Sequence, residues 1–181
     1  GHTSTQYRTV NVRKRSGQKC LSHHCARWSA TAYLGRGMQG VADAGNATAI
    51  SGQYLASTVT AIRTGGYSAA GSGAGVYAND SLATSALAAA HPRFCKQSLD
   101  GRYWRLLPEI SGFISVMQGG AAGNGVADDY AAVQAALDYA KSFGGATVYF
   151  PAGSYKVNTT PQITDAQGIN LRGEGPDRSI I

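Results

Sequence analysis

Two cysteines and two histidines, residue types that bind zinc, lie together near the N-terminus. They are Cys20, His23, His24 and Cys25. Structural zinc usually takes paired ligands from two separated stretches of chain, with a turn between them. Here the four candidates share one short stretch, and the distant partners are His91 and Cys95. The pattern therefore favours polar loop residues at a protein contact, and we expect no metal and no cofactor.

The neighbouring carboxylates Asp128 and Asp129 are the other pair whose residue type suits catalysis. A catalytic carboxylate pair needs both groups directed at one bond. Adjacent residues at a helix start point in different directions, whereas an aspartate there can accept hydrogen bonds from the free N–H groups of the first turn. We interpret Asp128 or Asp129 as a helix N-cap and expect no catalytic residue in this chain. Three further acidic residues occupy expected turns, with no spacing that indicates a site: Asp165, Glu174 and Asp177.

The segment 119–125 is rich in glycine and precedes a predicted helix, as a phosphate-binding loop does. It lacks the Gly-Lys-Ser/Thr ending of a P-loop and the spacing of a dinucleotide fingerprint. We therefore expect its glycines to bend the backbone into the helix and not to hold a ligand.

Residues 130–142 are predicted to form a helix that covers the end of a β-structure. Small and apolar residues recur along it at helical spacing, and Gly144–Gly145 ends it. Short strands are expected at 147–150, 154–157 and 168–172, with another beginning at Ile180. Short strands, a turn at each corner and a helix across one end are typical of a right-handed parallel β-helix whose open end is covered, since bare strand edges expose unpaired backbone.

Residues 58–110 are predicted to form a small β-rich head module. Residues 59–63 alternate like a strand, and Asp100–Gly101 is a strong turn signal. Tyr103 and Trp104 lie in the strand that follows. Stacking on sugar rings is one role for them, but we interpret them as core aromatics, because so small a unit offers them little else to pack on.

Residues 1–57 are interpreted as a basic arm, and residues 111–181 as the start of the β-helix. The chain carries a net charge of +6, and no acidic residue precedes Asp43. Such an arm binds nucleic acid, an acidic protein surface or phospholipid, or remains a solvated tail. Nucleic acid is the weakest of these partners, because the arm lacks interleaved aromatics and a recognisable reading module. The basic residues crowd the first thirty positions: Arg8, Arg13, Lys14, Arg15, Lys19 and Arg27.

Composition argues against several other classes of protein. Only 14% of residues are charged and 24 are glycine, which favours turns, short strands and packed oligomer surfaces over a charged monomer. Three cysteines do not make a disulfide framework, and we expect synthesis in a reducing compartment. No apolar run approaches the roughly 20 residues needed to span a bilayer, and the first twenty residues lack the apolar core of a signal peptide.

Three separated blocks of the C-terminal third resemble the pectate-lyase-like β-helix superfamily, in the branch with an N-terminal Gly-Ala-x-Gly-Asp-Gly…Asp-Asp-Thr-x-Ala-x-Gln-x-Ala signature. Members include phage tailspikes, polysaccharide depolymerases and some glucanases. Asn124 stands where the family usually has Asp, and Tyr130 where Thr is usual; both keep the turn and cap chemistry workable. The blocks are Gly120-Ala121-Ala122-Gly123-Asn124-Gly125 with Asp128-Asp129-Tyr130-Ala131-Ala132-Val133-Gln134-Ala135-Ala136, then Val148-Tyr149-Phe150-Pro151-Ala152-Gly153-Ser154-Tyr155, then Leu171-Arg172-Gly173-Glu174-Gly175-Pro176.

The head module also resembles a small β unit that precedes such β-helices in tailspike-like proteins. The similar stretches are 63–77, with Ser72 and Ala74 as departures, and 100–106. The whole layout is therefore mainly β with a capping α-helix: basic arm, head module, then the first coils of a β-helix. The working surfaces of such a fold lie on later coils, which we expect beyond Ile181.

The resemblance implies the N-terminal, virion-attaching part of a phage tailspike or tail fibre. Its implied partners are two further copies in a homotrimer, and a tail, adaptor or baseplate protein bound through the arm. Host surface polysaccharide would be bound, and perhaps cleaved, by the later coils, so this stretch itself is expected not to be an enzyme. Its implied location is the virion tail, after synthesis in the host cytoplasm. The alternative is the N-terminal part of a secreted bacterial polysaccharide lyase or glycanase.

Overall fold

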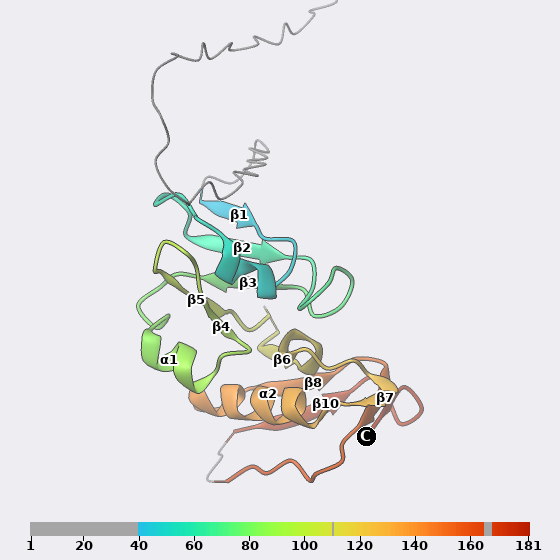
Figure 1. Cartoon of the computed structure of the whole chain (residues 1–181). Helices are drawn as coiled ribbons and strands as arrows, with labels where there is room; N and C mark the ends of the chain where they lie inside the picture. The colour runs from blue at the N-terminus through green and yellow to red at the C-terminus, as the bar shows by residue number, and fades with distance from the viewer. Residues whose placement is uncertain (1–39, 110, 165–167) are drawn as a thin grey trace, which may run out of the picture. The chain divides into compact units, whose positions relative to one another are not determined.

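A computed structural model describes residues 40–109, 111–164 and 168–181 (Figure 1). The segment that contains Cys20, His23, His24 and Cys25 lies outside the described residues, as does most of the basic arm. The described residues form one compact unit, in which a head sheet is followed by two small parallel sheets and a covering helix. The predicted fold class, mainly β with a capping helix, is confirmed.

The head sheet has five strands in the order β1-β2-β3-β5-β4. β2, β3, β5 and β4 pair antiparallel, whereas β1 pairs parallel with β2. A short 3-10 helix, η1 (Thr48–Gly52), and a short helix, α1 (Ser85–Ala90), lie in its connections. The strands are β1 (Val41–Asp43), β2 (Ala61–Thr64), β3 (Gly75–Ala78), β4 (Cys95–Gln97) and β5 (Tyr103–Leu106).

The structure moves the start of the sheet ahead of the predicted boundary at residue 58. Val41 pairs with Ala61, and Ile50 of η1 is fully buried, so residues 41–57 belong with the sheet and not with the arm. The reason for the error is physical. β1 is only three residues long and is held by pairing with β2 about twenty positions later. The glycines of residues 41–57 also interrupt any regular spacing of apolar residues that could have indicated a strand or helix.

Alternate residues of the head strands form the core of this module. Ile62 of β2, Tyr77 of β3 and Leu106 of β5 are fully buried and lie opposite one another along the register. In β2 the buried residues are Ile62 and Thr64, whereas Ala61 and Arg63 point to the opposite face, because successive strand residues alternate between faces.

The C-terminal part winds through two three-stranded parallel sheets, in the orders β10-β8-β6 and β11-β9-β7. Each turn of the chain adds one strand to each sheet, which is the arrangement of a parallel β-helix. A 3-10 helix, η2 (Val116–Gly119), follows the first strand. The strands are β6 (Phe113–Ser115), β7 (Asn124–Asp128), β8 (Thr147–Phe150), β9 (Gly153–Lys156), β10 (Asn170–Gly173) and β11 (Ser179–Ile180).

Apolar residues stack inside the coil from one rung to the next. Ile114 of β6 pairs with Val148 of β8, and both are fully buried, whereas Leu171 of β10 pairs with Val148 and is 58% exposed. The described coil is therefore closed at its first rung and exposed at its last one.

Helix α2 (Tyr130–Ser142) closes the first rung, with the predicted bounds. Its buried face holds Ala132, Val133, Ala136, Leu137, Tyr139 and Ala140, and the helix contacts β6, β8 and η2. Gly144 at φ +74° follows it, in the left-handed region that glycine adopts without strain. The predicted capping helix is confirmed.

Candidate functional site

Asp129 lies at the N-terminus of α2, but its side chain does not cap the helix. It is 2% exposed, and its carboxylate accepts hydrogen bonds from the backbone N–H groups of Ala122 (2.6 Å) and Gly123 (3.0 Å). The predicted capping role of Asp129 is therefore wrong. Its partners lie six and seven residues upstream in the glycine-rich loop, so its charge stabilises the bend of that loop.

Asp128 performs the capping task, and it is exposed. Its Oδ1 accepts from the backbone N–H of Tyr130 at 3.0 Å and from that of Asn158 at 3.3 Å. The hydrogen bond from the Tyr130 N–H is the main cause that lowers the pKa of Asp128. The two carboxylates therefore serve different parts of the backbone and do not face one bond.

The glycine-rich loop between η2 and α2 bends tightly against its surroundings. Gly120 has φ +91°, and a Cβ there would lie 2.6 Å from the Tyr67 ring. Gly123 has φ +60°, and its Cβ would approach Met117 and Tyr155. These glycines turn the backbone at close contacts, and Asp129 occupies two of the N–H groups that a phosphate would need.

Trp104 is a core residue, as the sequence indicated. It is fully buried, and its indole N–H donates to the Ser98 hydroxyl at 2.8 Å. The Arg102 guanidinium lies 4.8 Å from the centre of the Trp104 ring. Tyr103 is half-buried, and its carbonyl accepts from the Asn79 amide at 2.8 Å. Trp104 therefore offers no free stacking platform.

His91 and Cys95, the distant candidates for a metal site, lie at the end of α1 and in β4. Burial lowers the pKa of His91 and raises the pKa of Cys95 to about 11. A thiol that stays protonated is a poor metal ligand. Among residues 40–109, 111–164 and 168–181, no group of three or more His, Cys, Asp or Glu side chains is placed to hold a metal ion.

The acidic turn residue Glu174 lies at the surface of the coil and has local partners. Its carboxylate accepts from the Tyr149 hydroxyl at 2.7 Å and lies 3.8 Å from Arg178. This hydrogen bond is the main cause that raises the pKa of Tyr149. Asp177 lies in the neighbouring turn, while Asp165 is outside the described residues.

The head sheet and the capping helix are joined through Tyr139, which the sequence analysis did not single out. Tyr139 is fully buried and stacks on Phe94 of the head, with ring centres 4.7 Å apart and planes at 4°. Its hydroxyl donates to the Leu106 carbonyl at 2.5 Å. Burial is the main cause that raises the pKa of Tyr139. One side chain of the cap thus supplies both apolar and polar contact to the head.

Two further polar contacts fix the same junction. The Gln118 amide, 1% exposed, accepts from the Ser115 N–H at 2.9 Å and donates to the Ala74 carbonyl at 2.9 Å. Arg93 of the head donates to the Gly119 carbonyl at 2.6 Å. Because the buried Gln118 amide has both an acceptor and a donor partner, its polar atoms are satisfied as they are in a protein interior.

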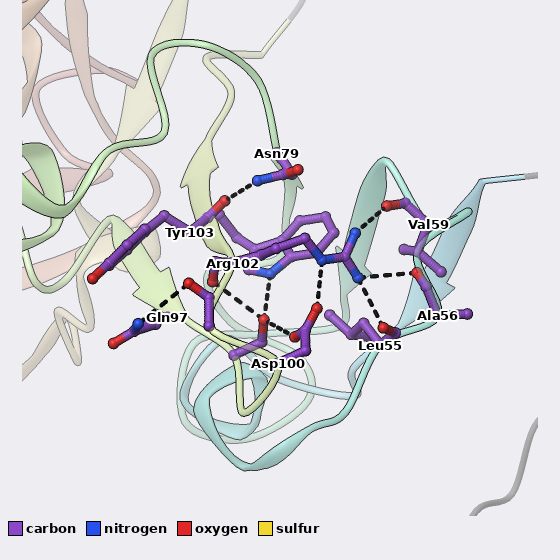
Figure 2. A network of polar contacts seen from close by, with 11 residues as sticks. Leu55, Ala56, Val59, Asn79, Gln97, Asp100, Arg102 and Tyr103 are labelled. Atoms are coloured by element: carbon purple, nitrogen blue, oxygen red, sulfur yellow. Dashed lines mark hydrogen bonds and ion pairs between the residues drawn. The ribbon is translucent and has the colours of Figure 1, made fainter.

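At its other end, the head sheet carries a network around Arg102 (Figure 2). The Arg102 guanidinium donates to the carbonyls of Leu55 (2.9 Å), Ala56 (2.9 Å) and Val59 (2.8 Å), and it pairs with Asp100. A single side chain of the β4–β5 hairpin thus holds the whole loop that precedes β2.

A second arginine, Arg105, stabilises the connection after β3. Arg105 is 8% exposed and forms a bidentate pair with Asp80, at 2.8 and 2.6 Å. Hydrogen bonding from Arg105 is the main cause that lowers the pKa of Asp80.

The C-terminal part can now be compared with known families. Residues 113–181 match the family described as rhamnogalacturonase A/epimerase, pectate lyase-like. The matched region begins at β6 and contains all six strands of the coil and the capping helix. The resemblance noted for the last third of the chain is confirmed.

Curated relatives from Azotobacter vinelandii are similar over the same length of chain. Mannuronan C5-epimerase AlgE5 is 51% identical over 67 residues, 34% of this chain and 7% of the relative. Mannuronan C5-epimerase AlgE4 is 43% identical over 67 residues and alginate lyase 7 is 45% identical over 67 residues; the match covers 12% and 8% of them. The chain thus spans a small part of the length of these relatives.

Solved structures share the fold over more of the chain. Tailspike protein 2 of Escherichia coli O157:H7 bacteriophage CAB120 aligns with 82% of this chain and 17% of its own, at a TM-score of 0.53 and 16% identity. The tailspike of Acinetobacter baumannii phage AM24 aligns with 65% of this chain over 18% of its own length, at a TM-score of 0.51 and 21% identity. Pantoea stewartii WceF aligns with 74% of this chain over 20% of its own length, at a TM-score of 0.53 and 19% identity. It is described as a glycan biofilm modifying enzyme with a bacteriophage tailspike-like parallel β-helix fold.

Among the residues that the structure describes, no helix is long and apolar enough to cross a membrane. α2, the longest, has 13 residues.

Proposed function

We propose that this chain is the N-terminal, virion-attaching part of a phage tailspike or tail fibre. In this role, the head module and the arm before it bind a tail, adaptor or baseplate protein. The β-helix that starts at residue 113 carries the surfaces that bind, and in some such proteins cleave, host polysaccharide. The assembly is a homotrimer located in the virion tail.

The observation that carries this proposal is the joined unit of head sheet and capped coil. The family match begins at residue 113 and so leaves out the head module. The likeness to the CAB120 tailspike covers 82% of the chain and so includes part of the head module. The buried Tyr139–Phe94 stack and the Gln118 hydrogen bonds make the head an integral cover of the coil. A head fixed in this way sets the direction in which the shaft points.

The test uses tail particles assembled without this protein, prepared from the virus that encodes it. The purified 181-residue chain is expected to co-sediment with them and to sediment as a trimer when free. A chain that stays monomeric at high concentration and does not bind the particles contradicts the proposal.

The relatives support a second candidate, the N-terminal part of a secreted bacterial enzyme that acts on polysaccharide. The curated relatives are named epimerases and a lyase. WceF is a bacterial protein whose alignment also includes residues before position 113. A secretion signal in the complete gene, with modification of a polysaccharide by the full-length protein outside any virion, favours this candidate over the first.

A further inference from the structure

Strand β7 is an exposed edge of the coil. It lies at one end of the sheet of order β11-β9-β7, and all five of its residues are exposed. The register pairs Asn124 with Ser154 and Asp128 with Lys156, so five residues of β7 lie opposite three of β9. Residues 125–127 therefore form a bulge that is open to water.

The bulge follows directly from the one Asn-Gly pair of the sequence, Asn124 and Gly125. Asparagine is a chemically labile residue, because the backbone nitrogen of the next residue can attack its side-chain carbonyl carbon, Cγ, and close a succinimide ring. The two reacting groups lie on adjacent residues, so the reaction needs no encounter between molecules. Gly125 has no side chain to crowd its nitrogen, and its φ of +70° is free of strain for glycine.

The fold holds the Asn124 amide in one position. Its Oδ1 accepts hydrogen bonds from the backbone N–H groups of Val126 (2.9 Å) and Ala127 (3.0 Å). When Cγ is attacked, negative charge develops on this same oxygen. Backbone donors that already point at such an oxygen stabilise the transition state, as they do in an oxyanion hole. The two N–H groups therefore orient the side chain and make its carbonyl carbon more reactive.

We propose that Asn124 is a site of spontaneous deamidation in the folded chain. The Gly125 nitrogen, after losing its proton to hydroxide, forms a bond to Cγ of Asn124. The bond from Cγ to the amide nitrogen breaks, and that nitrogen leaves as ammonia. Water then adds to one of the two carbonyls of the succinimide and opens the ring, which gives either aspartate or isoaspartate at this position. The reaction uses water and hydroxide and needs no enzyme or cofactor.

The two products affect the first rung of the coil differently. Aspartate keeps the acceptor oxygen, and its charge strengthens the hydrogen bonds from the Val126 and Ala127 N–H groups. Isoaspartate adds a carbon atom to the backbone of β7, which shifts the strand against β9 and weakens the pairing beside Ser154. Both products add a negative charge to the exposed bulge, so the surface of the coil changes with the age of the molecule.

The experiment incubates the purified full chain at mildly alkaline pH in water labelled with heavy oxygen, and follows each asparagine by peptide mass spectrometry. Asn46 is the internal control. Its Oδ1 also accepts two hydrogen bonds, but the next residue, Ala47, is fully buried and its N–H donates to the Gly66 carbonyl at 2.9 Å. We expect Asn124 to gain labelled oxygen about tenfold or more faster than Asn46. The rate should rise with pH, because the attacking nitrogen must lose its proton.

The same measurement on the chain unfolded in urea separates the effect of the fold from the reactivity of any Asn-Gly pair. We expect the folded chain to react at least as fast as the unfolded one. A folded chain that stays unchanged while the unfolded chain reacts would overturn the proposal, because pairing with β9 would then shield the reacting atoms. Equal rates at Asn124 and Asn46 would overturn it as well. Asn124→Gln should abolish the uptake of label at this position, and thermal unfolding should show that Asn124→Asp, which matches one product, is at least as stable as the parent.

Discussion

Replacing Asp129 by Asn tests the structural role of the neighbouring aspartates most directly. In the parent, the buried carboxylate accepts from two backbone N–H groups, at 2.6 and 3.0 Å. Asn retains one acceptor oxygen, so one N–H is left facing an amide NH₂ group. Asp128→Asn is the matched control, because it removes the same charge while its retained Oδ1 can still accept from Tyr130 and Asn158.

The expected magnitude follows from these bonds. Hydrogen bonds to a charged group contribute about 1.5–3 kcal/mol each, and an unsatisfied buried donor costs about 1–3 kcal/mol. Asp129→Asn loses one such bond and the charge of the other, so we expect a loss of about 3 kcal/mol in the free energy of unfolding. For a chain of this size, that loss lowers Tm by about 6–12 °C. Asp128→Asn, at an exposed site, should cost about 0.5 kcal/mol.

Thermal and urea unfolding followed by circular dichroism measures both variants against the parent. Equal stability of the two variants would refute the reasoning, because it would mean that the Asp129 carboxylate does not hold the loop. The same pair addresses the catalytic alternative. In a longer chain with polysaccharide-cleaving activity, a catalytic Asp129 would lose kcat on substitution while the fold kept its stability.

Three further predictions concern the head and its junction with the coil. Gly73→Ala should destabilise the chain far more than Gly71→Ala in urea unfolding: both have positive φ, but a Cβ at Gly73 would overlap the backbone of η2, whereas Gly71 has open space around it. Tyr139→Phe should cost about 1–2 kcal/mol, because it leaves a buried carbonyl unpaired, and should speed amide hydrogen exchange at the junction; unchanged exchange would contradict the role given to this hydroxyl. Asp80 has a folded-state pKa below its unfolded value, so the stability it contributes is present above that unfolded value, about 3.9, and is lost as pH falls through the folded pKa. In Asp80→Asn, the free energy of unfolding should therefore fall less steeply as the pH is lowered into the acid range. A fall as steep as the parent's would show that the pair with Arg105 does not contribute to stability.

The capping helix and the strands of the coil were predictable because their signals are local. Apolar spacing and the glycines after Phe143 set the bounds of α2, and Thr147–Phe150 is a run of β-forming residues bounded by turns. β1 was not predictable, since its three residues are a strand only through pairing with β2.

The side-chain roles that matter most depend on contacts between distant segments. Arg102 finds its three carbonyl partners more than forty residues away, and Tyr139 donates to a carbonyl 33 residues away. Composition and periodicity carry no information about such pairs. Asp129 shows the same limit at short range. Its type and position fit a helix cap, but the folded glycine-rich loop brings the Ala122 and Gly123 N–H groups to its carboxylate instead.

The short edge strand β1 has a mechanical consequence. Any tension on the chain before Gly40 enters the sheet through three residues and the hydrogen bonds at their start. Short strands at a sheet edge open at low free energy, whereas the Tyr139 junction at the opposite end is buried. Under load, β1 would detach from the sheet before the junction with the coil opens. The coil would stay folded, and β1 would pair with β2 again when the force is released.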